Sequence, residues 1–341
     1  MPDSNKYTPS ATPSPLPWQG KSWQRLGAQW RAERFPHALL LSGQAGLGKR
    51  RFAEAFVALV LCEQPRDGLA CGDCRGCRLW QAGSHPDFLR VEPDKSGGPI
   101  KVEQIRRLGE FVARTSGREG ARVIWLAPAE AMNASAANAL LKNLEEPAAA
   151  VIFLLITDAA AGLLPTIRSR CQLLPFAAPP EDTALSWLKA GGLDGEIGRR
   201  VLALASGAPL LALQLAEPEF REARDQFLQD LSALSRAGAS AVAIAGRWAT
   251  PSGDIELTML LQFWQHWVTQ MLRARSCDLT LDPQIMGLLQ RLPRVGQRDL
   301  RALFTFYDHL SQGRQALVSG ANPNRVLLLE ELLVRWGRLY Q

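Results

Sequence analysis

The chain has 341 residues, of which 47% are hydrophobic and 21% charged, and its net charge is +6. This length suits two or three domains, and the composition is that of a globular protein with a real core. The small excess of basic residues does not by itself indicate a nucleic-acid partner. The sequence lacks an apolar run long enough to span a membrane. Residues 1–17 resemble a disordered leader and not a secretion signal, so we expect a protein of the reducing cytoplasm.

From Trp23 to Phe176 the sequence alternates apolar strands with helices. The predicted strands are 37–41, 87–91, 122–126, 151–156 and 171–176. The predicted helices between them are 50–61, 102–114 and one that runs through Asn138 to Glu145. Near-continuous apolar strands that alternate with helices predict an α/β domain with a parallel sheet covered on both faces.

The proline-rich segment 176–180 is the predicted linker to an all-helical remainder. Helices are expected at 181–190, at 196–205 and after Pro209. A second break falls at Glu217 and Pro218, and longer amphipathic helices are expected at 221–236, 255–275, 298–318 and 325–340. The predicted domains are therefore 18–177 (α/β), 178–216 (small and helical) and 217–341 (larger and helical).

The segment GQAGLGKR at residues 43–50 has the glycines and lysine of a phosphate-binding P-loop. It follows a predicted strand and opens a predicted helix, the context in which backbone N–H groups wrap phosphates and the lysine reaches them. Gly43, Gly46, Gly48 and Lys49 are therefore the candidate nucleotide-binding residues. Arg50 stands where a working P-loop has a Ser or Thr that binds Mg²⁺, and Arg has no lone pair to offer a metal. The sequence predicts a degenerate P-loop.

The strand expected to supply metal-binding carboxylates ends without them. In active P-loop ATPases, acidic residues at this position hold Mg²⁺ and orient the attacking water. Here the strand 122–126 is followed by Ala127 and Pro128, neither of which binds a metal. Glu130 lies beyond the strand end and is interpreted as a solvated residue at a helix start. The two losses together predict that the chain's own hydrolysis site is inactive.

Four cysteines, Cys62, Cys71, Cys74 and Cys77, follow the predicted helix 50–61. The spacing C-x8-C-x2-C-x2-C suits four thiolates around one Zn²⁺ in a closed, structural site. A redox pair needs only two of these cysteines, and an iron–sulfur cluster usually has a Cys-Pro ending that this sequence lacks. Structural zinc is the favoured cofactor, with redox chemistry and a cluster as the alternatives.

Several segments together carry a resemblance to a known family. They are NALLKNLEEP at 138–147, FLLITD at 153–158 and SRC at 169–171, joined by the cysteine loop and by SHPDF at 84–88. With these motifs the chain resembles the clamp-loader branch of the AAA+ ATPases, and within it the non-hydrolysing subunits of bacterial DNA polymerase III. The resemblance covers residues from about Trp18 to Cys171. It is looser in the last third, where it rests on NPNRVLLLEELL at 322–333.

The resemblance implies an AAA+ domain, a helical lid and a C-terminal collar through which subunits join in a ring. It implies that Arg170, in the SRC motif, acts as an arginine finger in trans at the ATP site of a neighbouring gamma or tau subunit, with Arg168 as the second choice. The other implied partners are the delta subunit, the beta sliding clamp and primed DNA, all within the DNA-directed DNA polymerase III holoenzyme, and no membrane. Leu210 stands where the family has a second sensor arginine, which argues further against ATP binding and against ATPase activity of the isolated chain.

Two functions of other classes stay open on sequence alone. One is an active P-loop, DNA-dependent ATPase in which Glu130 replaces the missing carboxylates. The other is a zinc-bearing module that binds DNA through its cysteine loop, although that loop carries charges of both signs.

Overall fold

The computed structural model describes residues 13–95, 98–113, 121–249, 257–276, 283–293, 297–318 and 323–341. These residues form two compact units, one ending at Leu211 and the other beginning at Ala212. The finer division into three domains stays a prediction. Within the described parts of the chain, none of the helices has the length and hydropathy needed to span a membrane.

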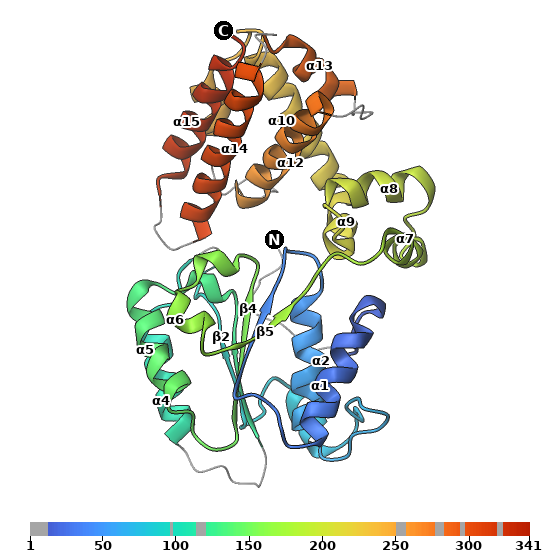
Figure 1. Ribbon diagram of the computed structural model, residues 1–341, viewed down its shortest axis with the longest axis vertical. Coiled ribbons are helices and arrows are strands. Elements are labelled where there is room, and N and C mark those ends of the chain that lie inside the picture. The colour runs from blue at the N-terminus through green and yellow to red at the C-terminus, as the bar shows by residue number, and fades with distance from the viewer. Residues whose placement is uncertain are drawn as a thin grey trace. The chain divides into compact units, whose positions relative to one another are not determined.

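The first unit is built on a five-stranded parallel sheet (Figure 1). Its strands are β1 (Ala38–Ser42), β2 (Phe88–Val91), β3 (Arg122–Leu126), β4 (Val151–Thr157) and β5 (Gln172–Pro175), in the order β2-β3-β4-β1-β5. Each lies within one residue of its predicted ends. Every residue of β4 is buried, as expected for an inner strand of a sheet covered on both faces. The predicted α/β fold class is therefore confirmed.

Helices cover the two faces of this sheet (Figure 1). The face of α1 (Gly20–Arg31), α2 (Lys49–Leu61) and α3 (Arg75–Gln81) packs on Leu39 and Leu41 of β1. The face of α4 (Val102–Ala113) and α5 (Ala134–Glu145) packs on Leu40. Because successive side chains of a strand point to opposite faces, three consecutive leucines of β1 serve two separate cores.

The remaining elements of the first unit are short. They are the 3-10 helices η1 (Pro17–Gln19), η2 (Ala129–Ala131) and η3 (Ala160–Gly162), and the helices α6 (Pro165–Arg168), α7 (Glu181–Ala190), α8 (Gly195–Leu204) and the start of α9 (Pro209–Ala216). Parallel pairing places Ser42 of β1 opposite Thr157 of β4. The loop after β1 and the turn after β4 therefore lie side by side at the carboxyl ends of the strands, which is where ligands bind in open α/β folds.

The described chain begins at Pro13, inside the segment predicted as a leader, and residues 1–12 lie outside the described residues. Leu16 is only 2% exposed, and its backbone N–H donates to the side chain of Gln19. A Cβ on Gly48 would collide with the Leu16 side chain. The ordered fold thus includes a few residues before the predicted start at 18, because Leu16 is an apolar side chain with a buried place to fill.

The second unit is helical and encloses an aromatic core. It contains α10 (Pro218–Leu234), α11 (Ala241–Trp248), α12 (Leu257–Ser276), α13 (Pro283–Arg291), α14 (Gln297–Val318) and α15 (Arg325–Arg338). Trp264 of α12 contacts Phe227, Phe306 and Trp336 from three other helices. These tryptophans are core residues here, and each ring pair adds to the stabilisation given by apolar burial.

Helices α1, α3, α6, α11 and α13 are not among the predicted elements. α3 shows why: its N-cap is Cys74, whose sulfur accepts the backbone N–H of Cys77. This capping depends on how the cysteine loop folds and not on a repeating apolar pattern in the sequence.

Candidate functional site

The P-loop lies where the sequence predicts it, between β1 and α2. Gly46 and Gly48 have φ values of +80° and +83°, which only glycine adopts without strain. A Cβ on Gly46 would lie 2.5 Å from the Leu211 Cβ. The glycines of the motif are therefore used both for the turn and for close approach of neighbouring segments.

The ammonium group of Lys49 is fully occupied within the protein. Its Nζ forms an ion pair with Asp158 Oδ1 at 2.6 Å and donates to the carbonyl oxygens of Gly43 at 2.5 Å and Gln44 at 2.7 Å. The Lys49 side chain is 3% exposed. An ammonium has three hydrogens to donate, and these three acceptors use all of them. A phosphate could bind Lys49 only by displacing one of the acceptors.

Neighbouring segments also seal the loop itself. Trp18 Nε1 donates to the Leu47 carbonyl at 3.2 Å, and Gln19 Nε2 donates to the carbonyls of Leu47 and Gly48 at 3.1 and 3.0 Å. From α9, the Leu210 backbone N–H donates to the Gly46 carbonyl at 3.1 Å. The loop thus joins the N-terminal segment to the helices that follow the sheet, within the first unit.

Arg50 pairs outside the P-loop. Its Nη1 pairs with Glu92 Oε1 at 2.8 Å, and the same oxygen accepts the indole N–H of Trp125 at 3.2 Å. The residue that replaces the metal-binding hydroxyl therefore ties α2 to the segment after β2.

The end of β3 holds one carboxylate, and it is buried. Glu130 is 6% exposed and accepts the Asp158 backbone N–H at 2.9 Å. The interpretation of Glu130 as a solvated residue is thus wrong, because η2 turns it under the end of β4. Burial raises the pKa of its carboxyl above the ordinary value. Thr157, also buried, accepts the Ala159 backbone N–H at 3.1 Å.

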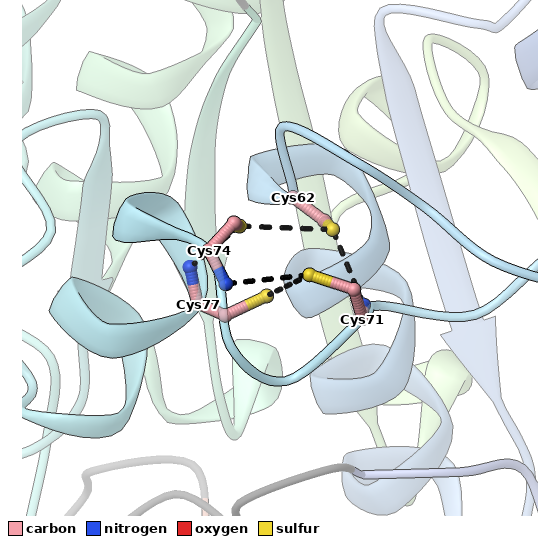
Figure 2. A group of neighbouring side chains, drawn as sticks. All are labelled: Cys62, Cys71, Cys74 and Cys77. Carbon is pink, nitrogen blue, oxygen red and sulfur yellow. Dashed lines mark hydrogen bonds between the residues drawn. The ribbon is translucent and has the colours of Figure 1, made fainter.

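The four predicted cysteines lie together (Figure 2), and their sulfur atoms are all within 4.8 Å of one another. The Cys62–Cys74 and Cys71–Cys77 sulfur pairs are each 3.9 Å apart. Four sulfurs at about 2.3 Å from one tetrahedral Zn²⁺ would be about 3.8 Å apart. The donor set therefore fits a closed metal site.

Backbone N–H groups point at these sulfurs, as thiolates require. Cys74 Sγ accepts from the N–H groups of Glu63 and Cys77, each at 3.4 Å. Burial opposes ionisation of Cys74, but these N–H groups, together with hydrogen bonds from the Cys77 and Cys71 side chains, outweigh it and lower its pKa to about 7. Burial is the main cause that raises the pKa of Cys77 well above its usual range. Since metals bind thiolates, a bound metal would displace the remaining protons.

Arg170 lies just after α6, on the surface of the first unit. Its side chain is 36% exposed, and Nη2 pairs with Glu145 Oε1 at 2.7 Å. Nη1 donates to the Thr166 carbonyl at 3.0 Å and lies 3.4 Å from Ser169 Oγ. Arg168 is exposed as well.

The structure thus brings the predicted P-loop residues together and the predicted cysteines together. Sequence reasoning missed the carboxylates that form ion pairs with the two predicted site cations: Asp158 pairs with Lys49, and Glu145 pairs with Arg170. Both stand inside quoted motifs, FLLITD and NALLKNLEEP, but a carboxylate's partner across the fold leaves no spacing pattern in the sequence.

Family models and proteins of known name are similar to this chain over most of its length. A family model described as "DNA polymerase III, delta subunit" matches residues 18–180, and its C-terminal counterpart matches 218–338. The DNA polymerase III subunit delta' of Pseudomonas aeruginosa is 40% identical over 95% of this chain and 97% of its own length. That of Escherichia coli K12 is 32% identical over 94% of each. The Haemophilus influenzae protein of the same name is 36% identical over 62% of this chain and 65% of its own.

Solved structures show more distant likeness. A gamma-subunit-related protein from Thermotoga maritima has a TM-score of 0.44 and 18% identity, over 94% of this chain and 99% of its own. A RuvB variant from the same organism has a TM-score of 0.40 and 15% identity, over 88% and 86%. These values are too low to bear on function.

The parallel sheet, the P-loop motif after its inner strand β1 and the helical regions that follow define an AAA+-type fold, in which the P-loop lysine is paired within the chain. The family models and full-length relatives narrow this class. The chain belongs to the family of DNA polymerase III delta-prime subunits, proteins of DNA replication.

Proposed function

We propose that the chain is a non-hydrolysing subunit of the DNA polymerase III clamp loader. It supplies Arg170 as an arginine finger to the ATP site of a neighbouring gamma or tau subunit. Together with the delta subunit, the complex then loads the beta sliding clamp on primed DNA. Family membership supports the complex, and the two cation sites support the division of labour within it.

The observation that carries the non-hydrolysing role is the occupied Lys49. In an active P-loop the lysine reaches the terminal phosphates of the nucleotide. Here the Asp158 carboxylate and two loop carbonyls take its three hydrogens. Arg50 is paired with Glu92, and Glu130 is buried against the Asp158 backbone. The side chains that could handle Mg²⁺ or phosphate are thus bound to other parts of the same fold.

Arg170 has the chemistry that the proposed role requires. A guanidinium keeps its charge at every physiological pH, and its planar fork matches phosphate oxygens. The side chain is partly exposed on the surface of its unit, so a neighbouring subunit can approach it. In other systems such fingers accelerate phosphoryl transfer by roughly 10³–10⁵.

The cysteine cluster is proposed to hold structural zinc. Cys62, Cys71, Cys74 and Cys77 fill all four tetrahedral positions, which leaves no open position for a substrate. Zinc would fix the loop between α2 and α3, a segment too short to bury a core of its own.

The test is to reconstitute the clamp loader with an Arg170→Ala chain and measure ATP turnover with clamp and primed DNA. Total ATP turnover should fall by the part that the ATP site next to Arg170 contributes, and clamp loading should fall with it. Arg168→Ala is the matched control, an exposed arginine two residues away, and should leave the rate unchanged. An unchanged rate for Arg170→Ala would exclude the finger.

The isolated chain should not turn over ATP. Steady hydrolysis by the purified chain that Lys49→Met abolishes would instead show an active P-loop ATPase.

A further inference from the structure

The guanidinium of Arg170 faces its own chain. Nη2 is bound to Glu145, and Nη1 is bound to the Thr166 carbonyl and lies close to Ser169 Oγ. Both terminal nitrogens, which would form the fork toward a phosphate, therefore already have acceptors. A bidentate contact with a nucleotide requires the side chain to exchange these partners.

The elements on both sides of this contact are well fixed. Glu145 is the last residue of α5, which is anchored by buried Leu140 and Leu144. α6 packs against α5, and its Ile167 is fully buried. The position of Glu145 relative to Arg170 is thus set by the core and not by a loose loop.

Electrostatics favour the same position. Glu145 ends α5, so the cation lies close to the C-terminal end of that helix. This end carries partial negative charge. In the free subunit the charge of the guanidinium is accordingly balanced by groups of its own fold.

We propose that Glu145 holds Arg170 in a parked conformation, and that the phosphates of ATP bound to the neighbouring subunit compete with Glu145 for the guanidinium. The inference rests on the proposed finger role. Glu145 is in this view a positioning residue that acts only through Arg170. The finger is released when a polyphosphate is presented, so the neighbouring site is stimulated only when it is loaded and docked.

The strength of the contact suits a reversible switch. Arg170 and Glu145 are 36% and 49% exposed, and pairs this exposed are weak. A polyphosphate with several charges can therefore outcompete a single carboxylate. Removal of the Glu145 charge should raise the rate by only about two- to fivefold, the range that such weak pairs allow.

The test is a double-mutant cycle in the reconstituted complex, with kcat/KM for ATP measured in the presence of clamp and primed DNA. Glu145→Gln should raise the part of kcat/KM that depends on Arg170 by about two- to fivefold when Arg170 is present. It should have no effect in an Arg170→Ala background, because its only route is through Arg170. Glu146→Gln removes the same charge from the next, also exposed residue and should change nothing.

The other outcomes are distinguishable. A fall in kcat/KM for Glu145→Gln, or an equal change with and without Arg170, would overturn the parked conformation. If Arg170→Ala itself had no effect, the finger role would fail, and the parked contact would be judged in the isolated chain. There the Arg170 Nε–Hε NMR signal should report a side chain that is ordered in the wild type and mobile in Glu145→Gln. Equal mobility in both would overturn the contact.

Discussion

Lys49 and Arg50 are neighbours at the end of the P-loop, but one is buried and the other is exposed. The Lys49 side chain is 3% exposed and bound on three sides, whereas Arg50 is 52% exposed and pairs with one carboxylate. In an active ATPase the lysine would contribute to nucleotide binding. Here its contacts are all internal, so its contribution is to the stability of the fold.

We therefore expect Lys49→Met to destabilise the first unit by about 1–3 kcal/mol, since it removes the buried charged donor of an exposed carboxylate and of two partly buried loop carbonyls. Arg50→Met should cost about 1 kcal/mol or less, as for other exposed pairs. The measurement is urea or thermal unfolding of both variants beside the wild type. Equal stability of the two variants would contradict the structural role of Lys49.

Glu130 predicts a dependence of stability on pH. Its pKa in the fold is raised above the ordinary value of 4.5, chiefly by burial. As the pH rises above 4.5, the Glu130 carboxyl ionises in the unfolded chain before it ionises in the fold. The folded state therefore loses stability until the pH passes the raised pKa of Glu130. Glu130→Gln removes this penalty.

Glu130→Gln should accordingly unfold at a higher temperature than the wild type at pH 7, and the gain should shrink as the pH is lowered toward 4. A gain on the order of 1 kcal/mol is usual for a single stabilising change. Melting curves across this pH range test it, with Glu146→Gln as an exposed control that shows no such trend. A gain that is independent of pH would contradict the assigned cause.

At the scale of elements, the cysteine cluster joins two helices. Cys62 follows the last residue of α2, and Cys74 caps α3. Trp80 of α3 is 2% exposed and packs edge-on against Phe88 of β2. A Cβ on Gly76 would collide with the Leu61 carbonyl at the end of α2. A metal at the cluster would thus hold α3 against both α2 and the sheet edge.

Removal of the metal should loosen this element first. Fresh protein should contain about one zinc per chain, as the four-thiolate site requires. A chelator, or Cys74→Ser, should remove it and speed amide hydrogen exchange across residues 62–81 before the sheet strands are affected. Cys171→Ser, outside the cluster, should keep the metal. Unchanged exchange after zinc loss would show that the metal does not order α3.

At the scale of the whole molecule, the two units have separate cores. The first is organised by the two faces of the sheet, and the second by aromatic contacts around Trp264 and Trp336. Trp336 is fully buried, and its indole N–H donates to the Leu231 carbonyl at 3.4 Å.

Separate cores predict two unfolding transitions in calorimetry. Trp336→Ala should destabilise the second unit by about 3–5 kcal/mol and leave the transition of the first unit in place. Phe304→Ala, on α14 but 56% exposed, should have little effect on either. An equal shift of both transitions by Trp336→Ala would show that the chain unfolds as one cooperative body.

The fold class, the order of the strands along the chain, the P-loop and the four cysteines could all be predicted from the sequence. These are local or periodic features: alternating apolar segments, glycines at a strand end and thiols at fixed spacing. Ala127 and Pro128 could likewise be recognised as unable to bind a metal wherever the fold placed them.

The carboxylates that bind Lys49 and Arg170 could not be predicted, because the folding of the chain brings them there. The pairing of β1 with β4 brings Asp158 to Lys49, and the packing of α5 on α6 brings Glu145 to Arg170. The same holds for the burial of Glu130 and of Leu16. Each of these depends on segments distant in the chain that meet at one edge of the sheet or on one helix face, and such meetings leave no periodic trace in the sequence.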